Sequence, residues 1–217
     1  MKKNQWEKNF QKFSNKFNIV KFFGEYNIEK YLNDLNKDTR ILDFGCGKGK
    51  ILEFLKKKKF KNFYGFDITK NLIQKNLQNK LILSKDKSIN ILKNYKFNYV
   101  LFNGTLHHLS DPFITIKKLL NFHEKNFKSK NFYVIGIEPT NTILRLFGEF
   151  IILKTFIGDI FFKDLKNCLI EEWQTYKPWK EYSLKQINNK LIEIGLKKQL
   201  IKKTLFNTEF IYFKRDK

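Results

Sequence analysis

Apolar and polar positions change their spacing several times along this chain, and each change predicts a new element. Over residues 4–35 apolar side chains recur every three or four positions, which is typical of amphipathic helices, with Gly24 as a break. Short apolar runs then alternate with helical patterns, which predicts an α/β domain with a mostly parallel sheet. The expected strands are 40–44, 60–68, 81–84, 97–103 and 131–138, and the expected helices between them are 51–55, 71–78 and 113–127.

Residues 141–181 depart from this alternation and are expected to be an insertion. A broad apolar stripe at helical spacing runs from Ile143 to Ile157. Three interpretations remain open: a helix that covers the sheet edge or forms a homodimer contact, a lid over an apolar substrate pocket, and a membrane-surface helix within 143–162.

A helix and a hairpin are expected to close the sheet. Ser183 begins a capping box for a helix that ends at Gly195. Strands at 196–205 and 210–214 follow, with Asn207 and Thr208 between them as the expected turn. At 217 residues the chain is expected to be one domain. Its expected parts are an N-terminal helical cap at 1–37, a cofactor-binding core at 38–140, a helical insertion or lid at 141–181, and the closing helix and hairpin at 182–217.

The most informative stretch is residues 40–50, RILDFGCGKGK, in which a buried strand runs into three alternating glycines. Glycine permits positive φ and a close approach of the backbone to a ligand, and the following helix start presents unpaired N–H groups. Such a corner binds nucleotides in parallel α/β sheets. The dinucleotide fingerprint fails because Lys50 stands at its third small position, and a phosphate-binding P-loop fails because Ile51 follows Lys50.

The remaining pattern, Asp43-x-Gly45-x-Gly47-x-Gly49, resembles the first motif of the class I S-adenosylmethionine-dependent methyltransferases. The resemblance implies a doubly wound, Rossmann-like, seven-stranded sheet, mostly parallel with a C-terminal antiparallel hairpin and helices on both faces. It also implies that the glycines wrap the methionine part of the cofactor S-adenosyl-L-methionine, while Asp43 holds its amino group directly or through water. The alternative is a glycine turn that only packs helix on strand.

A second acid, Asp67, follows Gly45 by 22 residues at the end of the second expected strand. About 20 residues is the usual separation for a ribose-binding acid. The resemblance assigns Asp67 to the ribose hydroxyls, and the alternative is a helix cap or a solvated group. In the family, the loop after the third strand often supplies an acid for the adenine amino group. The expected cofactor-binding set also includes Cys46, Ile68, Asp86, Asn103 and Gly104, although a plain surface turn is an equal interpretation for Asp86.

Residues 104–112, GTLHHLSDP, closely resemble a further motif of the same family. Asp111 is expected to cap the helix that Pro112 opens. His107 and His108 are the candidate catalytic residues, because a histidine has a suitable ordinary pKa to act as general base for a hydroxyl or phenol. The alternative is that neither is a base and that one faces the core or solvent. Glu138, at the end of the fifth strand, is expected either to orient substrate or to cap residues 140–141.

Net charge of +22 and a pI near 9.8 would ordinarily favour nucleic acid or an anionic membrane. However, only three of the 43 cationic residues are arginine, the usual residue for phosphate and base recognition. Abundant Lys, Asn, Ile and Phe, which have A/T-rich codons, favour nucleotide bias as the cause. The two cysteines, Cys46 and Cys168, form no metal or disulfide pattern, which favours a reducing compartment.

The chain shows no signal peptide pattern and no apolar run of the roughly 20 residues that span a bilayer. A cytoplasmic methyltransferase for a small-molecule O, N or C nucleophile is therefore the main prediction, with no metal site. The alternatives are a nucleic-acid methyltransferase or binder, and a non-catalytic S-adenosylmethionine-binding protein.

Overall fold

The structure is a computed structural model that describes residues 27–68, 73, 75–84, 88–127, 131–139, 154, 184–204 and 207–215. Four expectations lie outside the described residues: the helices before residue 27, the loop acid Asp86, the insertion at 141–181 apart from residue 154, and the helix cap at Ser183.

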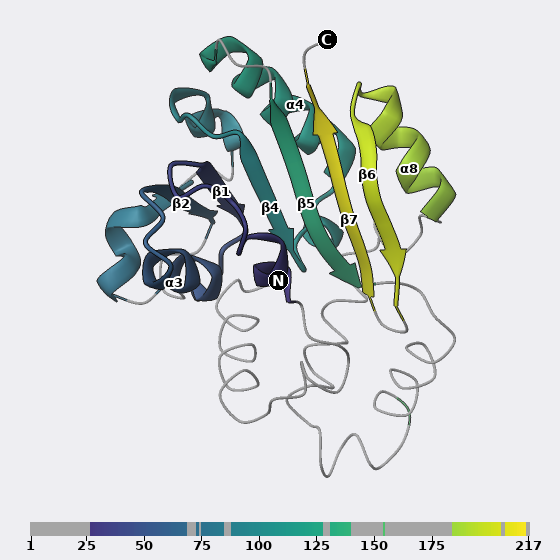
Figure 1. Cartoon of the computed structure of the whole chain (residues 1–217). Coiled ribbons are helices and arrows are strands. Elements are labelled where there is room, and N and C mark those ends of the chain that lie inside the picture. Colours follow the sequence, from purple (N-terminus) through teal and green to yellow (C-terminus); the bar gives the residue numbers. More distant parts are fainter. Residues whose placement is uncertain are drawn as a thin grey trace.

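The described elements build one seven-stranded sheet in the order β3-β2-β1-β4-β5-β7-β6 (Figure 1). Neighbouring strands pair in parallel except β7, which runs antiparallel to both β5 and β6. The order reverses between β1 and β4, which is where ligands bind in doubly wound sheets. The predicted fold class is therefore confirmed. The strands are β1 (Arg40–Phe44), β2 (Asn62–Asp67), β3 (Leu81–Leu83), β4 (Tyr99–Asn103), β5 (Phe132–Pro139), β6 (Lys197–Lys203) and β7 (Asn207–Lys214).

The helices begin where the sequence offers a start signal. Gly49, in the left-handed conformation, precedes α3, and the Asp111 carboxylate accepts hydrogen bonds from the N–H groups of Phe113 and Ile114 to cap α4. The helices are α3 (Lys50–Lys57), α4 (Pro112–Asn126) and α8 (Leu184–Glu193), with short 3-10 turns η1 (Ile28–Tyr31), η2 (Lys75–Lys80), η3 (Ile89–Asn94) and η4 (Leu106–His108).

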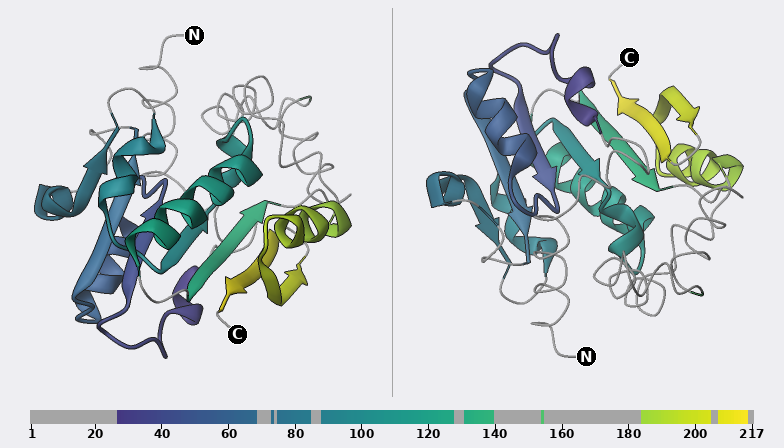
Figure 2. Two further views of the ribbon diagram at one scale, coloured as in Figure 1. Left: turned by 90° about the horizontal axis from the view of Figure 1, so that it is seen from above. Right: turned by 90° about the horizontal axis from the view of Figure 1, so that it is seen from below.

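The sheet has an apolar core on each face, because alternate strand residues point to opposite sides. On one face Phe102, Val134 and Tyr212 pack with residues of α4 and α8. On the other face Leu101, Ile135 and Ile211 pack with residues of η1 and α3. The views along the sheet in Figure 2 show α4 and α8 on one side and η1 on the other.

Three local predictions differ from the structure. The helical pattern expected to continue to residue 35 forms only the 3-10 turn η1 within residues 27–35. The described part of the segment expected as a helix at 71–78 forms the 3-10 turn η2. The hairpin turn expected at Asn207 and Thr208 is wrong, because both residues belong to β7 and pair with Pro139 and Glu138 of β5. The chain reverses just before them: Asn207 N–H donates to the Thr204 hydroxyl at 3.0 Å, and Thr204 N–H donates to the Asn207 carbonyl at 2.8 Å.

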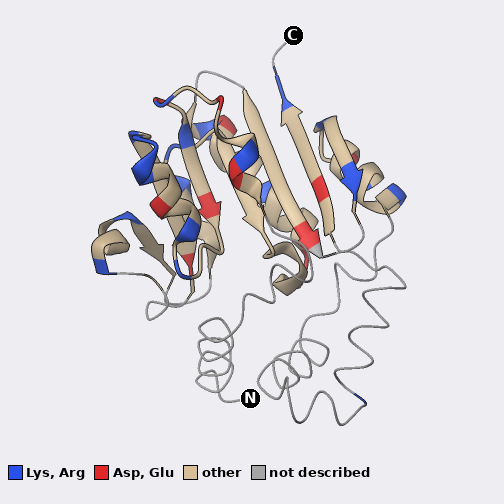
Figure 3. Ribbon diagram, turned by 60° about the horizontal axis from the view of Figure 1, so that its bottom comes forward, with Lys and Arg blue, Asp and Glu red and all other residues tan. Residues whose placement is uncertain are grey.

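Positions of charged residues are spread over the described elements, with basic residues on the helices and on the strands (Figure 3). Strand β6 is the outer strand of the sheet, and its exposed residues include four lysines. Lysine on an outer strand opposes edge-to-edge pairing with other chains. This gives part of the lysine excess a structural explanation that involves no anionic partner.

Candidate functional site

The glycine turn between β1 and α3 has the backbone that its sequence predicts. Gly45, Gly47 and Gly49 have φ of +76°, +50° and +79°. A Cβ on Gly45 would lie 2.3 Å from Cγ2 of Thr105, whereas a Cβ on Gly47 would meet no atom within 4 Å in the described structure. Gly45 is therefore required by packing, and Gly47 borders open space into which a ligand can enter.

Asp67 ties the glycine turn to the end of β2. Its Oδ2 accepts a hydrogen bond of 2.8 Å from Gly47 N–H. The N–H groups of Gly45 and Cys46 donate to the carbonyl of Phe66, at 2.8 and 3.1 Å. Asp67 therefore contacts the glycine turn directly, through a hydrogen bond that the sequence did not predict.

Asp43 is a buried acid beneath this turn, with 1% of its surface exposed. Its Oδ2 is buried and accepts no hydrogen bond within the described part of the chain. Burial, followed by the negative charge of Asp67, raises the pKa of Asp43 to about 8. A buried carboxyl without a partner is costly, and a ligand that carries an ammonium group would satisfy it.

Asn103 and Gly104 lie beside the turn at the end of β4. Phe44 of β1 pairs with Phe66 of β2 and with Phe102 of β4. The residues that follow these three, Gly45, Asp67 and Asn103, therefore lie at the same level of the sheet. The Asn103 Oδ1 is buried and has no hydrogen-bond partner among the described residues. Gly104 has φ of +67°, and its N–H donates to the Ile137 carbonyl at 2.8 Å.

The remaining expected cofactor residues differ in exposure. Ile68, directly after Asp67, leaves 39% of its surface exposed and offers a surface for an apolar ring. Cys46 is buried, and burial followed by the charges of Asp43 and Asp67 raises its pKa well above the ordinary value. A thiol in that state is not a nucleophile.

Glu138 organises the loop that carries the two histidines. This fully buried side chain accepts hydrogen bonds through Oε1 from Thr105 N–H at 2.9 Å and Leu106 N–H at 2.8 Å. Its Oε2 lies 2.9 Å from Nδ1 of His107. The role that the structure gives Glu138 was missed in the sequence, where only substrate and the adjacent residues 140–141 were considered as partners.

The two histidines have different surroundings. His107 is 4% exposed and held by Glu138, whereas His108 is partly exposed. Their ring centroids are 3.9 Å apart, with an angle of 42° between the planes. His107 is therefore the more buried of the two rings. A carboxylate that accepts from Nδ1–H leaves the lone pair of a neutral imidazole on Nε2.

Neither a metal centre nor a membrane span is found in the part of the chain that the structure describes. No group of three or more His, Cys, Asp or Glu side chains there could hold a metal ion. Within the same residues, no helix has the length and apolar character needed to cross a membrane.

The sheet order, the antiparallel closing strand and the glycine turn at the switch point together define the class I S-adenosylmethionine-dependent methyltransferase fold. A sequence model described as a methyltransferase domain matches residues 17–130, more than half of the chain. The chain therefore belongs to the methyltransferase domain family, and it is an enzyme of that class.

Solved structures have the same fold. A SAM-dependent methyltransferase from Aquifex aeolicus is 14% identical with a TM-score of 0.56, over 96% of this chain and 97% of the other. One from Archaeoglobus fulgidus is 19% identical with a TM-score of 0.55, over 90% and 97% of the two chains. The plantazolicin methyltransferase BpumL in complex with SAH is 13% identical with a TM-score of 0.63, over 99% and 92%. No match was found among curated proteins.

Proposed function

We propose that this enzyme transfers the methyl group of S-adenosylmethionine to an O, N or C atom of a small molecule. The observation that carries the proposal is Asp43, a buried acid with an unpartnered oxygen beneath a turn of three positive-φ glycines. A glycine turn that only packs helix on strand would not need a buried acid there, since an apolar side chain would fill the same place at lower cost.

The cofactor would lie across the ends of β1, β2 and β4. Asp43 would hold its ammonium group, and Gly45, Cys46, Gly47 and Gly49 would surround its methionine part. Asp67 would accept hydrogen bonds from the ribose hydroxyls while keeping its bond from Gly47 N–H. Ile68 and Asp86 would border the adenine, and Asn103 and Gly104 would lie beside the methyl donor. When bound, S-adenosylmethionine supplies a methyl group already activated on a sulfonium.

Because the donor is activated, the protein has mainly to align the acceptor with the methyl–sulfur bond. A base is needed only where the acceptor must lose a proton, as a hydroxyl or phenol must. His107 is the better candidate of the two histidines, since Glu138 fixes its Nδ1 and thereby the orientation of the ring. Glu138 would then stabilise the imidazolium and hold the ring in one orientation.

A small-molecule acceptor is favoured over nucleic acid by the chemistry of the surface and by one structural neighbour. The plantazolicin methyltransferase BpumL has been solved with desmethylPZN analogs and SAH, at 13–14% identity to this chain. In this chain lysines dominate the positive charge, and exposed ones lie on the outer strand β6. Homodimer or membrane-surface contacts through 143–162 and a cytoplasmic location stay predictions.

The proposal is tested by calorimetric titration of the full chain with S-adenosylhomocysteine, the product form of the cofactor. We expect one site per chain. Asp67→Ala should weaken binding by about 2 kcal/mol, the usual scale for a hydrogen bond to a charged group, or roughly 30-fold. Asp38→Ala, which removes an exposed acid from an ion pair with Lys61, is the control and should leave the affinity unchanged.

Methyl transfer itself is measured with labelled S-adenosylmethionine and a panel of phenols, amines and thiols. Absence of binding by the wild-type chain would overturn the proposed function. Binding with no transfer to any small molecule, but transfer to RNA or DNA, would replace the small-molecule acceptor by the nucleic-acid alternative. Binding with no transfer to either would favour a non-catalytic cofactor-binding protein.

A further inference from the structure

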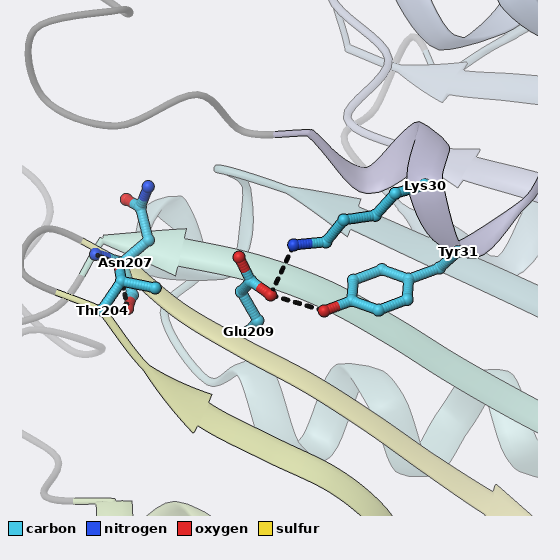
Figure 4. Close-up of polar contacts among 5 residues, drawn as sticks. All are labelled: Lys30, Tyr31, Thr204, Asn207 and Glu209. Carbon is cyan, nitrogen blue, oxygen red and sulfur yellow. Dashed lines mark hydrogen bonds and ion pairs between the residues drawn. The ribbon is translucent and has the colours of Figure 1, made fainter.

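A buried acid on β7 joins the far edge of the sheet to the start of the described chain. Glu209 is 6% exposed, and its Oε2 accepts hydrogen bonds from Lys30 Nζ at 2.7 Å and from the Tyr31 hydroxyl at 2.5 Å. Both donors belong to η1, about 180 positions earlier in the sequence. Figure 4 shows the two side chains reaching from η1 to a single carboxylate oxygen.

Glu209 lies in line with the expected cofactor site. It pairs with Ile137 on β5, and Ile137 pairs with Asn103 on β4. Glu209 is therefore two strand spacings, about 10 Å, from Asn103 along one row of the sheet. Ile211 and Ile41 belong to one buried cluster, so their side chains point to the same face of the sheet. Because alternate residues of a strand point to the same side, Glu209 and Asp43 also point to that face.

The turn η1 packs into the apolar cluster that supports the glycine turn. Ile28 and Leu32 are both fully buried, and they belong to the same cluster as Cys46 and Ile137. A displacement of η1 would therefore disturb the packing beneath Cys46, which is part of the glycine turn itself. Interiors are close-packed, so such a displacement is transmitted to neighbouring groups.

Burial of the Glu209 carboxylate costs free energy of folding, and what it provides in return is a fixed position for η1. Burial raises the pKa of Glu209, but the hydrogen bonds from Lys30 and Tyr31 and the charges of Lys30 and Lys202 outweigh it, so the net pKa is lowered. The ion pair is only partly buried, because 42% of the Lys30 side chain is exposed, and such pairs contribute little to stability. An apolar residue at 209 would instead extend the surface of Ile211. What the carboxylate adds is direction, because two donors on one oxygen fix both the position and the rotation of η1.

We propose that Glu209 is a positioning residue of the cofactor site, which through Lys30 and Tyr31 holds η1 as a fixed wall behind the glycine turn. This inference rests on the proposed function, since it concerns the site for S-adenosylmethionine. Glu209 does not touch the cofactor in this arrangement. It acts through η1 and the cluster that contains Ile28, Leu32 and Cys46.

The test combines calorimetric titration with S-adenosylhomocysteine and hydrogen exchange of the backbone amides at 28–32, on the full chain. In the wild type, ligand should slow exchange at 28–32. In Glu209→Ala, exchange there should be at least tenfold faster, the ligand should no longer slow it, and the dissociation constant should rise five- to tenfold. Glu209→Gln keeps an acceptor for the Tyr31 hydroxyl and should recover part of the affinity.

Two controls separate positioning from general stability. Glu124→Ala removes the ion pair between Glu124 and Lys214 on another part of the sheet and should change neither measurement. Ile187→Val lowers stability from the opposite face of the sheet, where Ile187 is 2% exposed, and should leave the dissociation constant within twofold of wild type.

The outcomes distinguish this inference from the proposed function. If the wild type does not bind S-adenosylhomocysteine, both fail. If the wild type binds and folded Glu209→Ala binds within twofold of it, the positioning role is refuted while the proposed function stands. A similar loss of affinity in Ile187→Val would also refute it, because the effect would then follow stability rather than η1.

Discussion

Cofactor binding should release a proton from Asp43. In the free protein, burial and the charge of Asp67 raise the pKa of Asp43 to about 8. At pH 7 a group with that pKa is protonated in about nine-tenths of molecules. An ammonium group beside Oδ2 favours the carboxylate, so each molecule that binds S-adenosylhomocysteine at pH 7 should lose about 0.9 proton from Asp43.

The same pKa sets the pH dependence of the affinity. Only the fraction with ionised Asp43 binds well, and that fraction is about 0.5 at pH 8, 0.09 at pH 7 and 0.01 at pH 6. The dissociation constant should therefore rise about 50-fold between pH 8 and pH 6. Each pH unit well below 8 costs about 1.4 kcal/mol of binding free energy.

Calorimetry at pH 7 in two buffers with different ionisation enthalpies measures the proton count directly. Asp43→Asn should bind more weakly, release no proton from this position, and have an affinity that is flat between pH 6 and 8. In Asp67→Asn, loss of the neighbouring negative charge should lower the pKa of Asp43 and reduce the release. Wild-type binding without proton release, or an unchanged release in Asp43→Asn, would refute the assignment of the ammonium group to Asp43.

Three further predictions follow from the same geometry. The folded state raises the pKa of Asp43 from 3.8, so the free protein loses stability as pH rises from about 4 to about 8. Asp43→Asn should therefore be more stable than wild type at pH 7, by more than 1 kcal/mol in chemical unfolding. At pH 3 the two proteins should be equally stable. Gly47→Ala should have a melting temperature within a few degrees of wild type but should lose S-adenosylhomocysteine binding. Gly45→Ala should not fold stably, because its Cβ would overlap Thr105. Equal melting temperatures of the two variants would contradict this. Glu138→Gln should lower the free energy of unfolding by about 2 kcal/mol, because it weakens the hydrogen bonds from two amides and an imidazole. An unchanged midpoint in guanidinium would contradict this role of Glu138.

The parts of the fold that the sequence predicts are those set by neighbouring residues. Alternating apolar runs place the strands, Asp111 and Pro112 mark the start of α4, and the three glycines mark the turn after β1. Each signal works because the physical requirement, a cap or a positive φ, is satisfied within a few positions of the chain. The same locality produced the wrong hairpin turn. Asn207 and Thr208 have turn-forming side chains, but β5 extends to Pro139 and pairs with both residues.

Only some of the site residues could be assigned from nearby sequence. The roles of the others depend on which strands pair and in which register. The position of Asp67 could be inferred from its separation along the chain, because one α/β unit has a characteristic length. Glu138 could not be assigned from its neighbours, since its partners lie more than 30 positions earlier. They meet it because β4 and β5 are parallel and pair Asn103 with Ile137, so that residues 105–107 emerge next to position 138. A polar residue at the end of a strand should therefore be compared first with the loop that follows the adjacent parallel strand.

Buried acidic residues are the feature that connects the separate parts of this site. Asp43, Glu138 and Glu209 are each less than a tenth exposed. Asp43 and Glu138 lie near the carboxyl ends of β1 and β5, and Glu209 lies near the amino end of β7, which is antiparallel to β5. Glu138 and Glu209 have their donors within the chain, from η4 and its preceding loop and from η1. Asp43 alone of these three keeps an oxygen without a donor among the described residues. Since buried acids are retained only where a donor compensates for burial, the donor for Asp43 is best sought in a ligand. Glu138 and Glu209, whose donors lie within the chain, fix the two segments between which that ligand would bind.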